Sequence, residues 1–173
     1  AKPVVLVTHM PLHSSAVFRL CGGEVPAAYP HNAVGHAEEV LRLLQNRAAV
    51  ACLAGHFHEN ERSFCGNAQL LTTGAVAGNW WRNGWDSPNI DGAPQGFRIV
   101  DVADGQITSR YRAFLPEQQR EAAVFRRGEE AFVNVFDGSA RTRVELDGAG
   151  VLLFVAPEAA PYDRRPAHLR AIP

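Results

Sequence analysis

Two histidines, His56 and His58, stand one residue apart directly behind the apolar run VACLA at residues 50–54. Side chains at positions i and i+2 of an extended segment point to the same side, so both imidazoles are expected to project together from the end of a strand. A third histidine, His9, follows another apolar run, PVVLVT at residues 3–8. If both runs are strands of one parallel sheet, the three rings meet at its carboxyl edge, where α/β folds bind ligands.

Converging imidazoles suit Zn, Fe, Mn, Co or Ni, whereas Ca and Mg prefer sites built from oxygen ligands. A single histidine at a strand end is more typical of a hydrogen-bonded structural residue, and the other four histidines of the chain are interpreted in that way. Two adjacent imidazoles on one face have little structural use. We therefore predict that His9, His56 and His58 are metal ligands.

A strand, a helix and a second strand are predicted around these histidines. The run at residues 3–8 is β-branched and continuous, as in a strand buried on both faces. Asn32 can cap a helix that starts at residue 33, has apolar residues at helical spacing and ends near Arg47. The run at residues 49–54 is the second strand. This order is typical of a βαβ unit and predicts that the first third belongs to an α/β sheet.

Antiparallel hairpins are predicted after this unit. Gly66-Asn67 separates ERSFC from AQLLTT, and Asp-Gly pairs at 104–105, 137–138 and 147–148 each separate two strand-like runs. Two-residue turns of this kind need residues with positive φ. The runs from residue 96 to residue 155 are therefore interpreted as a β-meander, with PEQQREAA at residues 116–123 as a connector or short helix. The predicted fold is α/β over residues 1–115, followed by a small antiparallel β-rich module over residues 116–173.

A stretch without periodicity lies at residues 74–94 and contains Trp80, Trp81 and Trp85. Loops of this length in a compact domain are usually functional or disordered, and three tryptophans argue against disorder. The rings either fill the seam between the two parts of the chain or wall a cleft and bind substrate by stacking. Asn60 lies close behind the histidine pair and is a candidate to bind substrate beside them.

Composition excludes several classes of partner. The 173 residues are 46% hydrophobic and carry a formal net charge of −1. We expect a soluble globular protein with no basic patch for nucleic acid. No apolar run approaches the roughly 20 residues that span a bilayer. Three scattered cysteines do not make a disulfide framework. A strand that starts almost at residue 1 suggests a piece of a longer protein or a trimmed product.

The motifs VVLVTHMPLH and GHFH, at residues 4–13 and 55–58, resemble those of the calcineurin-like metallophosphoesterases. The tryptophan-containing segment at residues 70–102 is similar to the segment behind these motifs in bacterial members with an extra C-terminal β domain. FVNVFDGSARTRVELDG at residues 132–148 is similar to part of that domain. The resemblance implies a partial layered metallophosphoesterase sandwich. It also implies a hydrolase, phosphatase or phosphodiesterase, whose substrate is a small-molecule phosphate ester.

In this family two divalent or transition metal ions, such as Zn, Mn or Fe, grip the phosphate ester and activate a water. The resemblance implies that His9 and His56 ligate one ion and His58 the other. Three upstream motifs of the family, Asp-x-His, Gly-Asp-x-x-Asp and Gly-Asn-His, do not occur in this chain. They supply the bridging carboxylate and other ligands, and no catalytic residue can be named here. We therefore expect a C-terminal part that lacks the N-terminal half of its domain and is inactive alone.

Two alternatives remain open from the sequence. In the first, the tryptophan loop on a β scaffold binds a carbohydrate or another ligand, and the histidines are incidental. In the second, the three histidines hold a single zinc with an open water position, as in mononuclear zinc hydrolases. The compartment is not determined, although related proteins with the C-terminal module suggest the periplasm or secretion.

Overall fold

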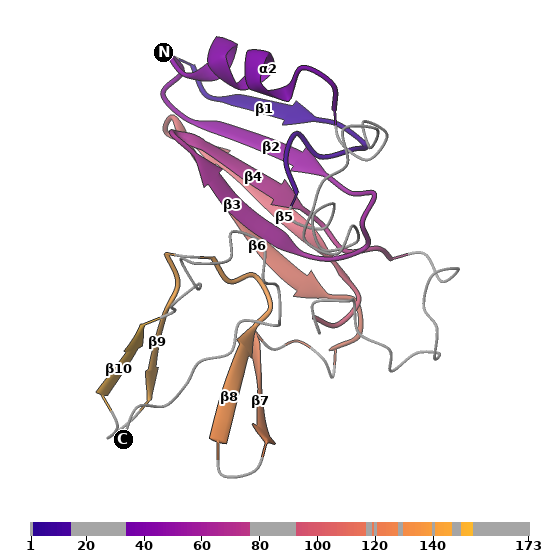
Figure 1. Ribbon diagram of the computed structural model, residues 1–173, viewed down its shortest axis with the longest axis vertical. Coiled ribbons are helices and arrows are strands. Elements are labelled where there is room, and N and C mark those ends of the chain that lie inside the picture. Colours follow the sequence, from indigo (N-terminus) through magenta and orange to yellow (C-terminus); the bar gives the residue numbers. More distant parts are fainter. Residues whose placement is uncertain are drawn as a thin grey trace.

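A computed structural model of the protein describes residues 2–14, 34–76, 93–116, 119, 121–127, 130–139, 141–146 and 150–153. The elements in these ranges, shown in Figure 1, are β1 (Val4–Val7), α2 (Ala37–Leu44), β2 (Val50–Ala54), β3 (Glu61–Cys65), β4 (Ala68–Thr72), β5 (Gly96–Ala103), β6 (Gln106–Ala113), β7 (Ala122–Arg127), β8 (Glu130–Val135), β9 (Arg143–Leu146) and β10 (Gly150–Leu153).

The first four strands form one sheet in the order β1-β2-β4-β3. β1 pairs with β2 and β2 with β4 in parallel, whereas β3 runs antiparallel to β4. The predicted parallel pairing of the two apolar runs is thus confirmed. Because Val7 is the partner of Leu53 and Ala54 is the partner of Thr72, the three parallel strands end at the same edge.

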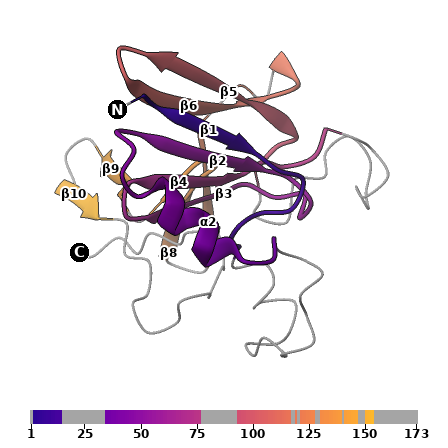
Figure 2. The same cartoon turned by 90° about the horizontal axis from the view of Figure 1, so that it is seen from above.

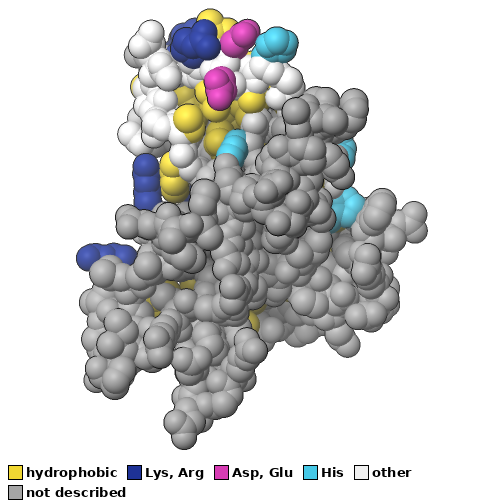
Figure 3. All heavy atoms as spheres, in the orientation of Figure 1, with side chains coloured by type: hydrophobic (Ala, Val, Ile, Leu, Met, Phe, Trp, Pro, Cys, Tyr) yellow, Lys and Arg dark blue, Asp and Glu magenta, His cyan; other side chains and the backbone are white. Residues whose placement is uncertain are grey.

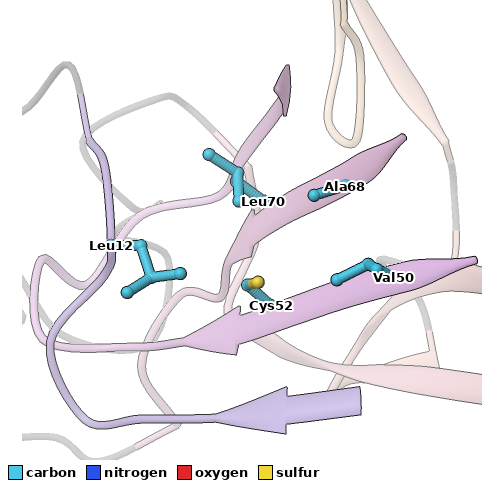
Figure 4. Packing of buried hydrophobic residues seen from close by; sticks show 5 residues of the cluster. All are labelled: Leu12, Val50, Cys52, Ala68 and Leu70. Atoms are coloured by element: carbon cyan, nitrogen blue, oxygen red, sulfur yellow. The ribbon is translucent and has the colours of Figure 1, made fainter. Parts of the chain in front are cut away.

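Each face of this sheet carries another layer, as Figure 2 shows. On one face, α2 packs through Val40, Leu41 and Leu44 on a core formed by β2, β4 and the segment after β1. Figure 4 shows the buried members of that core, which are Leu12, Val50, Cys52, Ala68 and Leu70. On the other face, Ala51 and Leu71 contact Ile107 and Val100 of the β5–β6 hairpin. Alternate residues of β2 and β4 therefore serve opposite cores.

The helix is shorter than predicted at both ends. Val34 is not helical, and α2 begins at Ala37 because His36, its N-cap, has a left-handed φ of 59°. The proposed cap Asn32 lies outside the described residues. At the other end, Leu44 is the last helical residue, ahead of the predicted Arg47. Eight residues are too few for a stable isolated helix, so α2 depends on packing of its apolar side against the sheet.

Two of the predicted hairpin turns are confirmed. Gly66 has a φ of 58°, and β3 pairs antiparallel with β4 across it. Asp104 and Gly105 have φ values of 50° and 76°, and they join β5 to β6. Positive φ at both central residues is the geometry of a tight two-residue hairpin turn, for which Asp-Gly is a preferred sequence.

The last strands pair differently from the predicted meander. β8 pairs with β7, whose first two residues, Ala122 and Ala123, end the segment interpreted as a connector or short helix, and the Phe136 amide after β8 donates to the Glu121 carbonyl before β7. β8 does not pair with β9, which begins only at Arg143, and neither Asp137 nor Gly138 has a positive φ, so the interpretation of Asp137-Gly138 as a hairpin turn is wrong. β9 and β10 form their own hairpin, and their connection at residues 147–149 lies outside the described residues.

The fold class is confirmed only in part. Regular structure in the described residues is mostly β-strand in small sheets, with one short helix, so the chain is not clearly an α/β sandwich. A β-rich C-terminal module agrees with the β7–β8 and β9–β10 hairpins. The boundary between residues 115 and 116 stays a prediction. No helix in the described part has the length and apolar character needed to cross a membrane.

Replacement of Gly96 by Ala tests the packing of the β5–β6 hairpin. A Cβ at this position would clash with the Arg112 carbonyl oxygen and lie 2.7 Å from Cζ of Tyr111, whose hydroxyl donates to Pro94. We expect Gly96→Ala to lower the free energy of unfolding by about 2 kcal/mol in chemical denaturation, because strands in register cannot move apart locally. Gly35→Ala is the control, since a Cβ there has nothing within 4 Å. Equal stability of the two variants would contradict this packing.

Candidate functional site

His9 and His56 come together at the carboxyl edge of the sheet. His9 Nε2 and His56 Nδ1 are 3.2 Å apart, and the two ring centroids are separated by 5.1 Å at an interplanar angle of 77°. The backbone fixes this approach, because the Gly55 amide donates to the His9 carbonyl over 3.1 Å. The main chain of His9 is therefore bonded to Gly55, and its side chain meets that of His56, 47 positions away in sequence.

The segment that carries His56 and His58 is not extended, so the strand geometry predicted for these two residues is wrong. His56 has a φ of 71° and His58 a φ of 54°, and the Phe57 amide donates to the Gly55 carbonyl over 2.8 Å. Left-handed non-glycine residues cost about 1–3 kcal/mol each unless the surroundings compensate, and such strain often accompanies a functional site. A tight turn, rather than a continued strand, positions both rings.

His58 lies near enough to the pair to interact with it electrostatically. Burial lowers the pKa of the His58 imidazole, and the charges that His56 and His9 would carry lower it further. Both causes favour the neutral ring near pH 7. A neutral imidazole keeps a lone pair for a metal ion, so the protonation state of His58 suits a ligand.

The geometry of the pair fits two ligands of one metal ion. Two nitrogens that are each about 2.0–2.1 Å from a tetrahedral zinc lie about 3.3 Å apart. His9 Nε2 and His56 Nδ1 are separated by 3.2 Å, which agrees with this spacing. A complete site is not formed, however. Within the described ranges, no group of three or more His, Cys, Asp or Glu could hold a metal ion.

Buried polar residues come directly after the histidines, and sequence reasoning did not single them out. Glu59 is 0% exposed and Glu61 is 6% exposed, and the Ser14 hydroxyl donates to Glu61 Oε2 over 2.7 Å. Only their position behind the Gly-His-x-His motif distinguishes them in the sequence. Ionisable side chains are rarely buried this deeply, so this edge of the sheet is unusually polar.

Asn60 also lies in this buried polar segment. Its Oδ1 accepts a hydrogen bond of 3.2 Å from the Gly74 amide, so the side chain holds the start of the tryptophan segment. Its Nδ2 is buried and has no hydrogen-bond partner within the described part of the chain. A substrate-binding role for Asn60 stays a prediction. Trp80, Trp81 and Trp85 lie outside the described residues, and their role stays a prediction as well.

Charged side chains of both signs lie near α2. Figure 3 shows basic, acidic and histidine side chains interspersed at the end of the molecule that carries this helix. This mixture agrees with the formal net charge of −1.

Comparison with known families finds a match for part of the chain. Residues 71–153 match the protein-family model described as the C terminal of calcineurin-like phosphoesterase. The match runs from the end of β4 to β10 and confirms the resemblance to this family for that part. It relates the chain to phosphoesterase-type hydrolases. His9, His56 and His58 precede the matched residues, so the match does not test their role. No curated protein and no solved structure gave a match to the chain.

Zinc titration followed by histidine side-chain NMR tests the pair. On addition of Zn²⁺ at neutral pH, we expect His9 Nε2 and His56 Nδ1 to shift together, with His58 shifting less. His9→Ala should weaken zinc binding by about tenfold or more, because half of the paired ligand set is lost. His36→Ala is the control, since this ring is 81% exposed and lies at the start of α2. Unchanged affinity in His9→Ala would show that the pair is not a ligand set.

Proposed function

We propose that the chain is the C-terminal portion of a metal-dependent phosphoesterase that hydrolyses phosphomono- or diesters at a dinuclear metal site. The family match of residues 71–153 carries this proposal. The paired imidazoles of His9 and His56, directly upstream of the matched segment, support it. The match begins at Leu71 in β4, the strand that lies beside β2 and therefore beside the histidine segment.

The proposed division of ligands follows the family resemblance, with His9 and His56 on one ion and His58 on the second. The distance of 3.2 Å between His9 Nε2 and His56 Nδ1 supports a shared ion for these two residues. When bound, the two ions supply an activated water and offset charge on the phosphoryl oxygens. The turn at Gly55 and Phe57 holds the imidazoles at the sheet edge, and Asn60 holds Gly74 beside them.

The remaining ligands are proposed to come from an N-terminal half with the three absent motifs. The surface of β1 supports such a partner. β1 lies at one end of the sheet order, and its Val5 and Val7 are 38% and 72% exposed. Apolar side chains on an edge strand are typical of a place where further strands or another layer dock. The docked half would bring its carboxylates to the histidine edge, because β1 ends there.

Hydrolytic activity of the chain lengthened at its N-terminus tests this function. We expect the 173-residue chain with Zn²⁺ or Mn²⁺ to show no turnover of p-nitrophenyl phosphate or its bis-ester. The same chain extended upstream by a segment with the three motifs should hydrolyse at least one of them and lose activity on chelation. His56→Ala in that extended protein should lower kcat by about 100-fold or more, since an inner ligand is lost.

His36→Ala serves as the matched control and should leave kcat unchanged. Metal-dependent turnover by the 173-residue chain itself would show that no second half is needed. One zinc held tightly by this chain alone would instead favour the mononuclear three-histidine site. Binding to glycans without any metal requirement would favour the carbohydrate-binding alternative.

A further inference from the structure

A buried ionic cluster joins the C-terminal strands to the sheet. Asp137, which lies just after β8, accepts from Arg98 of β5 through both carboxylate oxygens, at 2.8 and 2.9 Å. It also accepts from Arg62 of β3 at 2.6 Å. Ser109 of β6 lies between the two guanidinium groups and accepts from Arg62 Nη2 at 2.8 Å. One carboxylate therefore connects three sheets of the structure.

The cluster contains two positive charges and one negative charge in a place that water hardly reaches. The Arg98 side chain is 3% exposed, and those of Arg62 and Asp137 are 17% and 19% exposed. Nη2 of Arg98 is buried without a hydrogen-bond partner in the described residues. Burial lowers the pKa of Arg98, and the charge and hydrogen bonds of Asp137 raise it. Without Asp137, the two arginines would face each other with no counter-ion.

Arg98 extends this cluster toward the histidines. Its Nε donates to Thr73 Oγ1 over 3.2 Å. Thr73 lies just after β4 at the carboxyl edge, and its amide donates to the Ala54 carbonyl over 2.8 Å. Ala54 precedes Gly55, whose amide holds the His9 carbonyl. Thr73 also precedes Gly74, whose amide donates to Asn60 Oδ1.

We propose that Asp137 is a positioning residue for the histidine site. It keeps the Arg98 guanidinium in place over Thr73, and Thr73 in turn keeps the ends of β2 and β4 at the spacing that brings His9 and His56 together. The effect on catalysis rests on the proposed function. The effect on the sheet edge does not, since it depends on the hydrogen bonds alone. The C-terminal strands thereby act on a site more than 60 residues away in sequence.

Asp137→Asn tests the proposal, because it keeps the shape of the side chain and removes its charge. We expect amide hydrogen exchange at Thr73 and Gly55 to become about tenfold faster or more, relative to Val4. The Val4 amide donates to the Ala49 carbonyl at the opposite end of the sheet and serves as the reference far from the histidines. The histidine NMR signals of His9 and His56 should shift in the same variant.

Asp101→Asn is the matched control. It also removes a carboxylate from an Arg–Asp pair, with Arg110, but both side chains are 51% exposed and neither is joined to Thr73 in the structure. We expect it to change none of these amides selectively. Asp137→Glu should restore part of the protection at Thr73 and Gly55. If Asp137→Asn accelerates amide exchange by the same factor at Val4, Thr73 and Gly55, Asp137 contributes only to overall stability. That result would overturn the proposal.

Thr73→Val provides the test if Asp137→Asn does not fold. It removes the acceptor of Arg98 Nε and leaves the Arg98–Asp137 pair intact. Selectively faster exchange at Gly55 supports the proposal, and unchanged exchange overturns it. Zinc binding by the unmodified chain is measured in parallel. Failure to bind zinc would count against the metal site only, because the exchange experiment contains no metal.

Discussion

The parallel register of β1, β2 and β4 determines where the candidate histidines lie. Because Val7 is opposite Leu53 and Ala54 is opposite Thr72, the three strands end at the same edge of the sheet. Hydrogen bonds then fix the first residues after each strand. A slip of one residue would turn all side chains to the other face and separate His9 from the turn after β2. The histidine site is in this sense a product of main-chain pairing.

The charged cluster around Asp137 has a different physical basis from the rest of the core. Apolar contacts hold α2 and the β5–β6 hairpin on the sheet, and they tolerate small shifts. A buried arginine does not, since moving Arg98 away from its carboxylate exposes an uncompensated charge to a medium of low dielectric constant. The cation of Arg141 over the Phe64 ring, at 3.7 Å, adds a second contact between the segment after β8 and β3. The segment after β8 is thus attached through charged side chains to β3 and β5.

Local turn chemistry explains which elements were predictable from the sequence. Gly66-Asn67 and Asp104-Gly105 have backbone preferences that few other conformations satisfy, and their hairpins are confirmed. The same reasoning fails at Asp137-Gly138, because neither residue has the positive φ of a two-residue turn, and the Asp137 side chain instead forms a long-range ion pair that no local pattern reveals. It also fails after β2, where the Gly-His-x-His segment leaves the strand conformation at once. The meeting of His9 and His56 was predictable because it needs only parallel pairing. His9 and His56 do not by themselves form a metal site in the described ranges, and the ligands proposed to complete it have no counterpart in the sequence motifs of this chain.

Anomalous diffraction at the zinc edge, from crystals of the chain joined to the proposed motif-bearing N-terminal half, tests the central claim most directly. The account predicts two metal peaks about 3.5–4 Å apart. One peak should lie within bonding distance of His9 Nε2 and His56 Nδ1, and the other beside His58. A single peak bound by all three histidines, or no peak at this edge of the sheet, would contradict it.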